Sequence, residues 1–275
     1  MKKLVLLFGL CTALMGANAQ VKVPAPSPAQ TVKQEFGLSD IELSYSRPAM
    51  KGRKIFGDLV PFDKVWRTGA NGATTLTFGD EVIIGGKKIP AGKYGLLSIP
   101  GADSWTLIIS KQTDVTSPAA YKQDQDVVRV NAKPMKLPFQ LENFSISFED
   151  VTASSCELAI IWDNTLVSLP IKTNIDSKVM ADIEKSMQSD KPAYFQAAFY
   201  YLENGKDLDK AADWFKKAAD AQPNAFWIKY QYARALAKLG KKNEAKQTAL
   251  ASKELAAKAQ NQDYVTLNEK LISSL

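Results

Sequence analysis

The amino-acid sequence predicts a multidomain fold, in which an antiparallel β-sandwich is followed by an all-helical part. The composition changes sharply near Asn174. Before this residue, short runs rich in Val, Ile, Thr, Phe and Trp are separated by Gly, Pro, Asn and Asp, which is typical of strands joined by turns. After it, Ala, Lys, Glu, Gln and Leu recur with helical spacing. The 275 residues, 45% hydrophobic and 23% charged, are enough for two folded domains.

The N-terminus has the pattern of a secretory signal peptide. Lys2 and Lys3 precede an apolar stretch, Leu4 to Met15, which is followed by the small residues Ala17 to Ala19. We expect cleavage after Ala19 and a periplasmic or extracellular location. The apolar stretch is shorter than the about 20 residues that span a membrane, and no later stretch reaches that length. The predicted domains are a signal peptide at 1–19, a Pro-rich leader at 20–28, a β-sandwich at 29–174 and a helical domain at 175–275.

Ten short strands are expected in the β part with no helix between them, and such a series favours an antiparallel sandwich. Phe144, Ile146 and Phe148 alternate with polar residues, so one face of their strand enters a core. Two pairs that tolerate positive φ, Gly85–Gly86 and Asp163–Asn164, mark hairpin turns. Jelly-roll and immunoglobulin-like topologies both fit the pattern. The expected strands are residues 31–36, 41–46, 74–78, 81–84, 92–99, 105–110, 127–131, 144–149, 156–162 and 166–172.

The helical part contains a degenerate repeat of tetratricopeptide type. Ala211, Phe215, Ala218 and Pro223 have the spacing of a second repeat helix, and Ala245, Ala249 and Ser252 follow the first three at a period of 34 residues. Gly205 and Gly240 end the first helices, and Asp207 or Asn243 begins the next ones. A tail of this kind offers a surface for a protein or peptide partner. The expected helices are residues 177–188, 193–203, 208–221, 225–239, 242–257 and 263–273.

Several kinds of chemistry are excluded by composition. The chain contains no histidine, so it forms no Ser-His-Asp triad, His-ligated zinc site or His-based acid or base. It also lacks a phosphate-binding glycine loop, a dinucleotide fingerprint and an EF-hand, and we expect no metal and no cofactor. Basic and acidic residues are interspersed along the chain with no run of five like charges, which argues against nucleic acid as a partner. Cys156 lies in a strand-like run and is interpreted as a small buried hydrophobe.

The segment from residue 47 to residue 73 is too long and too rich in aromatic residues for an ordinary connection. Its arginines offer forked donors to an anionic small molecule or a glycan, and aromatic rings beside them offer walls. Alternatively, the arginines pair with Asp58 and Asp63 and bind loop carbonyls, which would only pin the segment to the sheet. The candidate ligand-binding residues are Tyr45, Arg47, Arg53, Trp66, Arg67 and Asn71.

A combination of motifs in and around this segment resembles the bacterial Domain of Unknown Function 2911 family. The resemblance covers roughly residues 27–173 and implies an exported β-rich domain, often joined to a helical repeat tail. It implies no established activity. The motifs that carry it are Tyr45–Pro48, Lys51–Arg53, Val60–Phe62, Val65–Asn71 and Pro90–Tyr94.

These observations favour an exported binding or scaffold protein without catalytic residues. An enzyme is the alternative. Without histidine it would need paired carboxylates, or a Lys- or Tyr-based mechanism, acting on an envelope glycan or peptide. A purely structural envelope protein is the third hypothesis. It predicts that Arg47, Arg53 and Arg67 are satisfied internally and that no concavity lies beside them.

Overall fold

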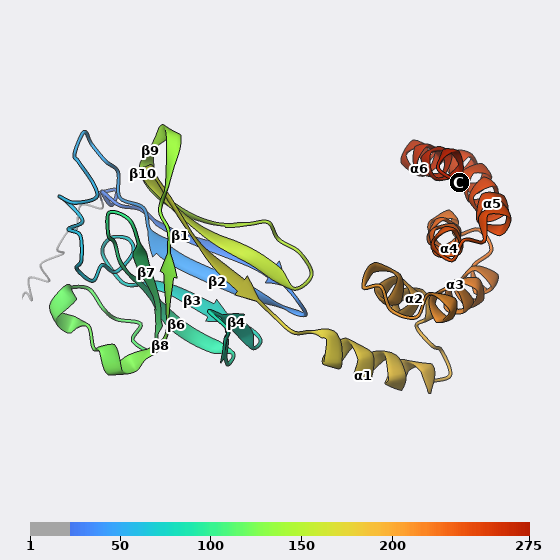
Figure 1. Cartoon of the computed structure of the whole chain (residues 1–275), viewed down its shortest axis with the longest axis horizontal. Coiled ribbons are helices and arrows are strands. Elements are labelled where there is room, and N and C mark those ends of the chain that lie inside the picture. Colours follow the sequence, from blue (N-terminus) through green and yellow to red (C-terminus); the bar gives the residue numbers. More distant parts are fainter. Residues whose placement is uncertain (1–22) are drawn as a thin grey trace, which may run out of the picture. The chain divides into compact units, whose positions relative to one another are not determined.

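The computed structural model describes residues 23–275, which divide after Asn174 into a β unit and a helical unit (Figure 1). The β unit contains two antiparallel sheets and the helical unit contains only helices, so the predicted all-β plus all-α class is confirmed. The predicted signal peptide and the first residues of the leader lie outside the described residues.

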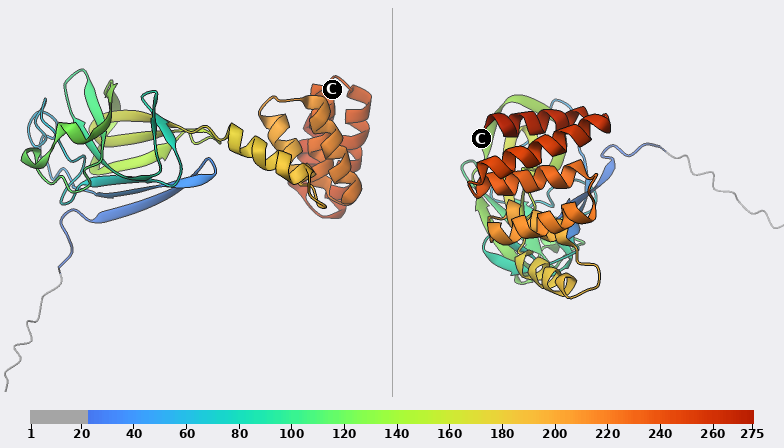
Figure 2. Two further views of the ribbon diagram at one scale, coloured as in Figure 1. Left: turned by 90° about the horizontal axis from the view of Figure 1, so that it is seen from below. Right: turned by 90° about the vertical axis from the view of Figure 1, so that its right-hand side faces the viewer.

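The larger sheet of the β unit has six strands in the order β1-β2-β3-β6-β7-β8. Neighbouring strands are antiparallel throughout, and Figure 2 shows the sheet as one of two layers. Short turns join β1 to β2 and β6 to β7, where Gly37 and Gly101 interrupt the strand pattern, and longer connections join the other strands. The strands are β1 (Ala29–Phe36), β2 (Ser39–Ser46), β3 (Thr74–Phe78), β6 (Gly92–Ile99), β7 (Trp105–Ser110) and β8 (Asp126–Ala132).

The smaller sheet has four strands in the order β5-β4-β10-β9. They are β4 (Val82–Ile84), β5 (Lys87–Ile89), β9 (Met135–Glu149) and β10 (Ser155–Lys172). The β4–β5 hairpin turns at Gly85 and Gly86, whose φ angles of 58° and 78° suit a two-residue turn, as predicted. Because β4 and β10 pair, strands from the middle and the end of the β unit's sequence share one sheet.

The two sheets enclose one hydrophobic core. Ile41, Leu43 and Tyr45 contribute from β2, and Leu158 and Ile160 from β10; all are at least nine-tenths buried. In β9, Phe144 and Ile146 enter the core and Phe148 packs against it, which confirms the predicted alternation. Burial of this many aliphatic and aromatic side chains is the main favourable term in folding.

Two expectations about the strands are corrected. Asp163 and Asn164 do not form a hairpin turn, because β10 continues through them and replaces the two strands expected at 156–162 and 166–172. Asp163 has a φ of 54° and lies at a β-bulge, where the pairing with β9 shifts register. The short strand β5 was not expected, since its sequence, Lys87–Ile89, has too little β-branched character to be distinguished from a turn.

The helical unit consists of consecutive helices, each packed against the next from α2 onward. Figure 2 shows them stacked in chain order. The first and last residues of the helices lie within two residues of the expected boundaries. Among the described residues, no helix has the length and apolar character needed to cross a membrane. The helices are α1 (Asp176–Met187), α2 (Tyr194–Glu203), α3 (Leu208–Ala221), α4 (Phe226–Lys238), α5 (Lys242–Lys258) and α6 (Gln262–Ser273).

The repeat positions within α3 and α5 face the interior of this unit, whereas Pro223, which follows α3, is exposed. Ala211, Phe215 and Ala218 of α3 are at least nine-tenths buried, and so are their counterparts Ala245, Ala249 and Ser252 of α5. The tetratricopeptide assignment itself stays a prediction. Gly205 and Gly240 follow α2 and α4 with positive φ, and the Asp207 carboxylate caps α3 by accepting from the Lys210 backbone N–H at 3.0 Å. Asn243 caps nothing, because α5 begins before it at Lys242.

Candidate ligand-binding cavity

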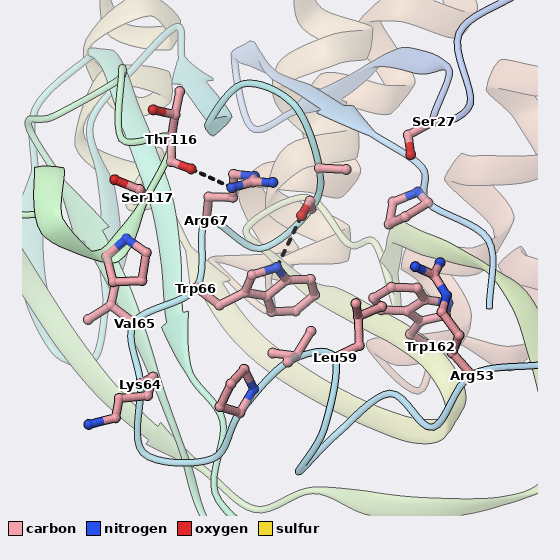
Figure 3. Close-up of a pocket in the computed structure, with 16 residues that line it drawn as sticks. Ser27, Arg53, Leu59, Lys64, Val65, Trp66, Arg67, Thr116, Ser117 and Trp162 are labelled. Atoms are coloured by element: carbon pink, nitrogen blue, oxygen red, sulfur yellow. Dashed lines mark hydrogen bonds between the residues drawn. The ribbon is translucent and has the colours of Figure 1, made fainter. Parts of the chain in front are cut away.

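A cavity of about 430 Å³ opens beside the long segment that connects β2 to β3. It is formed by parts of the chain that are distant in sequence: the leader, the 47–73 segment, the β7–β8 connection and β10. Figure 3 shows Arg67 and Arg53 on different sides of it, with Trp66 and Leu59 between them. The lining residues are Ser27, Pro48, Arg53, Leu59, Val60, Pro61, Lys64, Val65, Trp66, Arg67, Gly69, Ala70, Thr116, Ser117, Pro118 and Trp162.

The base of the cavity belongs to an aromatic cluster in the sandwich core. The rings of Trp66 and Trp162 are stacked with centroids 6.0 Å apart, and Phe56, Trp105 and Phe144 meet Trp66 edge to face. Trp66 donates its indole N–H to the Gly69 carbonyl at 3.0 Å, and Trp162 donates its indole N–H to the Glu142 carbonyl at 3.2 Å. Both donors are therefore occupied, and the tryptophans contribute apolar surface.

Backbone geometry holds Trp66 and Arg67 in place. Trp66 exchanges two backbone hydrogen bonds with Ser98 of β6, at 2.7 and 2.9 Å. The next residues turn sharply: Thr68 has a φ of 53° and Gly69 a φ of 154°. A Cβ on Gly69 would lie 2.9 Å from the Thr74 hydroxyl, so this position needs glycine. The Thr74 hydroxyl donates to the Thr68 carbonyl at 2.6 Å and fixes the turn.

Arg67 is partly buried and leaves one edge of its guanidinium without a partner. Its Nη1 donates to the Thr116 carbonyl, the one hydrogen bond that the described residues give this side chain. Nε is shielded from solvent and has no hydrogen-bond partner. Nε and Nη2 share the edge opposite Nη1, and their two parallel N–H groups match the two oxygens of a carboxylate. A buried unpaired N–H is costly, so an anion that displaces the atoms now shielding Nε would be stabilised at this edge.

Two further cations lie at the rim. Arg53 donates through Nε to the Met50 carbonyl at 2.8 Å and through Nη2 to the Ala49 carbonyl at 2.6 Å. Lys64 is exposed. No carboxylate is among the lining residues, so the cavity has a positive potential and favours an anion.

The structure brings together Arg53, Trp66 and Arg67 among the predicted site residues, but not the other three. The Arg47 Nε donates to the Phe144 carbonyl and its Nη1 to the Gln30 side chain, both at 3.0 Å. Tyr45 is buried, and its hydroxyl accepts from the Ile146 N–H at 3.0 Å and donates to the Ile146 carbonyl. Asn71 donates to the Ser27 carbonyl. These three residues hold the sheets and the leader together and do not line the cavity.

The interpretation of the arginines as loop-pinning residues is therefore partly right. All three bind backbone carbonyls, but none forms an ion pair with Asp58 or Asp63 among the ion pairs of the described residues. No acidic side chain that the structure describes forms an ion pair with Arg67.

Sequence reasoning missed several lining residues. Leu59 and Lys64 lie in the 47–73 segment, where the apolar side chain of one and the charge of the other could have marked them as lining residues. Trp162 was assigned only to a strand, although its position on the inward face with Leu158 and Ile160 was predictable from alternation. Thr116 and Ser117 come from the β7–β8 connection, which also holds the short 3₁₀ turns Pro118–Ala120 and Gln123–Gln125, and no local pattern marks them.

No group of three or more potential metal ligands occurs within residues 23–275. Cys156 is buried in the core as predicted, and burial, followed by the charge of the adjacent Glu157, raises the pKa of its thiol to about 11. The thiol is therefore protonated near neutral pH and is not a nucleophile.

The fold and the cavity define a class of protein in which a two-sheet sandwich with a cationic surface cavity precedes a helical unit. Residues 27–171 match the family model described as Protein of unknown function (DUF2911), and the chain belongs to this family. The resemblance found in the motifs is thereby confirmed. Neither the search of curated proteins nor the search of solved structures gave a match.

Proposed function

We propose that this is an exported binding protein that holds a small organic anion in the cavity of its β unit. The observation that carries the proposal is the unpartnered Arg67 edge at a cavity with cations and no carboxylate in its lining. The volume of about 430 Å³ is in the range of small-molecule sites. The N-terminal sequence, with its basic start and apolar stretch, supports export.

Binding without catalysis is favoured over the enzyme hypothesis by the residues at the cavity. A glycoside-cleaving or peptide-cleaving mechanism without histidine needs a carboxylate or another activated group beside the substrate. The lining has no Asp or Glu, and the Cys156 thiol lies in the core. A purely structural role is disfavoured because an arginine used only for packing would have its buried Nε satisfied.

The helical unit contributes a surface for a protein partner in this proposal. A second cavity, of about 790 Å³, lies between α1, α2 and α3. Met180 and Met187 of α1 face Tyr194, Tyr201 and Trp214 across it, and flexible methionines beside aromatic rings suit an adaptable protein contact.

The test is the affinity of the purified mature protein for small organic anions, measured by isothermal titration calorimetry. We expect Arg67→Ala to weaken binding by about tenfold or more, since a charged hydrogen bond contributes about 1.5 to 3 kcal/mol. Arg47→Ala is the matched control, because its guanidinium binds the sandwich outside the cavity. If no anion binds the wild-type protein, or if both variants bind equally well, the proposed function is wrong.

A further inference from the structure

We infer that the anion is a carboxylate with an apolar body, such as an alicyclic or aromatic acid, and not an acidic sugar. This inference rests on the proposed function and concerns the same cavity. The observations that carry it are the side-chain chemistry of the walls and the single free edge of Arg67.

The walls beside Arg67 are mainly apolar. Leu59, Val60, Pro61 and Val65 lie on one stretch of the 47–73 segment, and Pro118 adds a ring from the β7–β8 connection. Leu59 is 42% exposed although it lines a concave site. An apolar ligand body would remove such surface from water, which stabilises a complex in proportion to the area buried.

Hydrogen-bond acceptors for sugar hydroxyls are scarce in the lining. The sixteen lining residues include no Asp, Glu, Asn or Gln, and the polar uncharged side chains among them are Ser27, Thr116 and Ser117. The Gly69 and Thr116 carbonyls each accept one hydrogen bond already, from Trp66 and Arg67, which leaves one lone pair on each. A polyhydroxylated ring in this cavity would leave hydroxyl groups without partners, and each such group costs free energy.

The free donors of the cavity match a single carboxylate. The Nε and Nη2 groups of Arg67 provide two parallel donors, which is the bidentate arrangement that a planar carboxylate accepts. The Nε and Nη2 groups of Arg53 already donate to backbone carbonyls. Arg53 therefore adds positive charge at the rim but does not offer a second bidentate donor pair. The ligand thus places its carboxylate at Arg67 and its body along Leu59 and Trp66.

Four probes separate charge from body in one calorimetric series: cyclohexanecarboxylate, glucuronate, cyclohexylmethanol and acetate. Cyclohexanecarboxylate has both the ring and the charge, glucuronate adds hydroxyls to a six-membered ring, cyclohexylmethanol lacks the charge, and acetate lacks the ring. We expect cyclohexanecarboxylate to bind at least about tenfold more tightly than each of the other three.

A wall variant tests the apolar contact separately from the charge. Leu59→Asn is expected to weaken cyclohexanecarboxylate binding by at least about threefold and to leave acetate binding unchanged. Leu38→Asn is the matched control, because Leu38 is 52% exposed in the β1–β2 turn and does not line the cavity. Thermal melts of both variants establish that they fold.

The outcomes distinguish this inference from the proposed function. If glucuronate binds as tightly as cyclohexanecarboxylate or more tightly, and Arg67→Ala abolishes that binding, the apolar class is wrong and the anion site stands. If cyclohexylmethanol binds as tightly as cyclohexanecarboxylate, or if none of the four probes binds, the anion site itself is contradicted.

Discussion

Arg47 and Arg67 stand in the same region of the sequence but serve two different regions of the molecule. Arg47 bridges the sheets, with Nε on the Phe144 carbonyl and Nη1 on Gln30. Arg67 reaches a cavity, where Nη1 binds the Thr116 carbonyl and Nε has no partner. The two arginines thus have different roles. They differ in how many of their N–H donors already have a hydrogen-bond partner within the protein.

Truncation of a side chain buried between the two sheets should lower the free energy of unfolding more than truncation of an exposed one. Phe144 is fully buried and packs edge to face on Tyr45, Trp66 and Trp162. We expect Phe144→Ala to lower the free energy of unfolding in urea by about 3 to 5 kcal/mol, because the cavity it leaves adds to the lost burial. Phe139→Ala, on the exposed part of the same strand, should change it by less than about 0.5 kcal/mol. Equal effects would contradict this core assignment.

The reactivity of the Cys156 thiol measures how well the same core is shielded from solvent. Burial raises the pKa of this thiol from 9.0 to about 11, so at mildly alkaline pH the folded protein has about a hundredfold less thiolate than the unfolded chain. Because the folded-state pKa is raised, this contribution to stability is complete below pH 9 and is lost as the pH rises toward 11. Iodoacetamide labelling should be at least about a hundredfold slower in buffer than in urea. Similar rates would show that the thiol is accessible.

Tyr45→Phe should separate stability from binding. The hydroxyl of Tyr45 satisfies both the N–H and the carbonyl of Ile146 in the core, and losing it leaves both groups unpaired. We expect the free energy of unfolding to fall by about 1 to 3 kcal/mol. The affinity for cyclohexanecarboxylate should be unchanged, since Tyr45 does not line the cavity. A tenfold loss of affinity would place Tyr45 in the site.

Lys64→Ala should give the smallest effect. Lys64 is exposed at the rim, so its loss should change the free energy of unfolding by less than about 0.5 kcal/mol. Its charge should strengthen anion binding by about twofold at low ionic strength, and salt should remove that difference. A salt-independent loss would mean that the ammonium contacts the ligand directly.

The sequence predicts elements well where hydrophobic periodicity is local, and the site only where its residues are close in the chain. The helices are reproduced because caps such as Gly205 and Asp207 are local signals. Trp66, Arg67 and Arg53 were found because their segment is unusual in itself. Tyr45, Arg47 and Asn71 were grouped with them by proximity in sequence, but their hydrogen bonds go to distant partners such as Ile146 and Phe144. Alternation with Leu158 and Ile160 predicts that Trp162 faces inward, but the place where Trp162 and Thr116 meet depends on tertiary pairing, which residue patterns do not encode.

The most direct test of the central claim is the NMR signal of the arginine Nε–H groups in protein labelled with ¹⁵N-arginine. Arg→Lys variants assign the Arg47 and Arg67 resonances, which are then followed during titration with cyclohexanecarboxylate. We expect the Arg67 Nε–H resonance to shift on saturation, because an unpaired donor gains a carboxylate, and the Arg47 resonance to stay in place. A shift confined to Arg47, or no shift of Arg67 at saturating ligand, would contradict Arg67 as the anion contact.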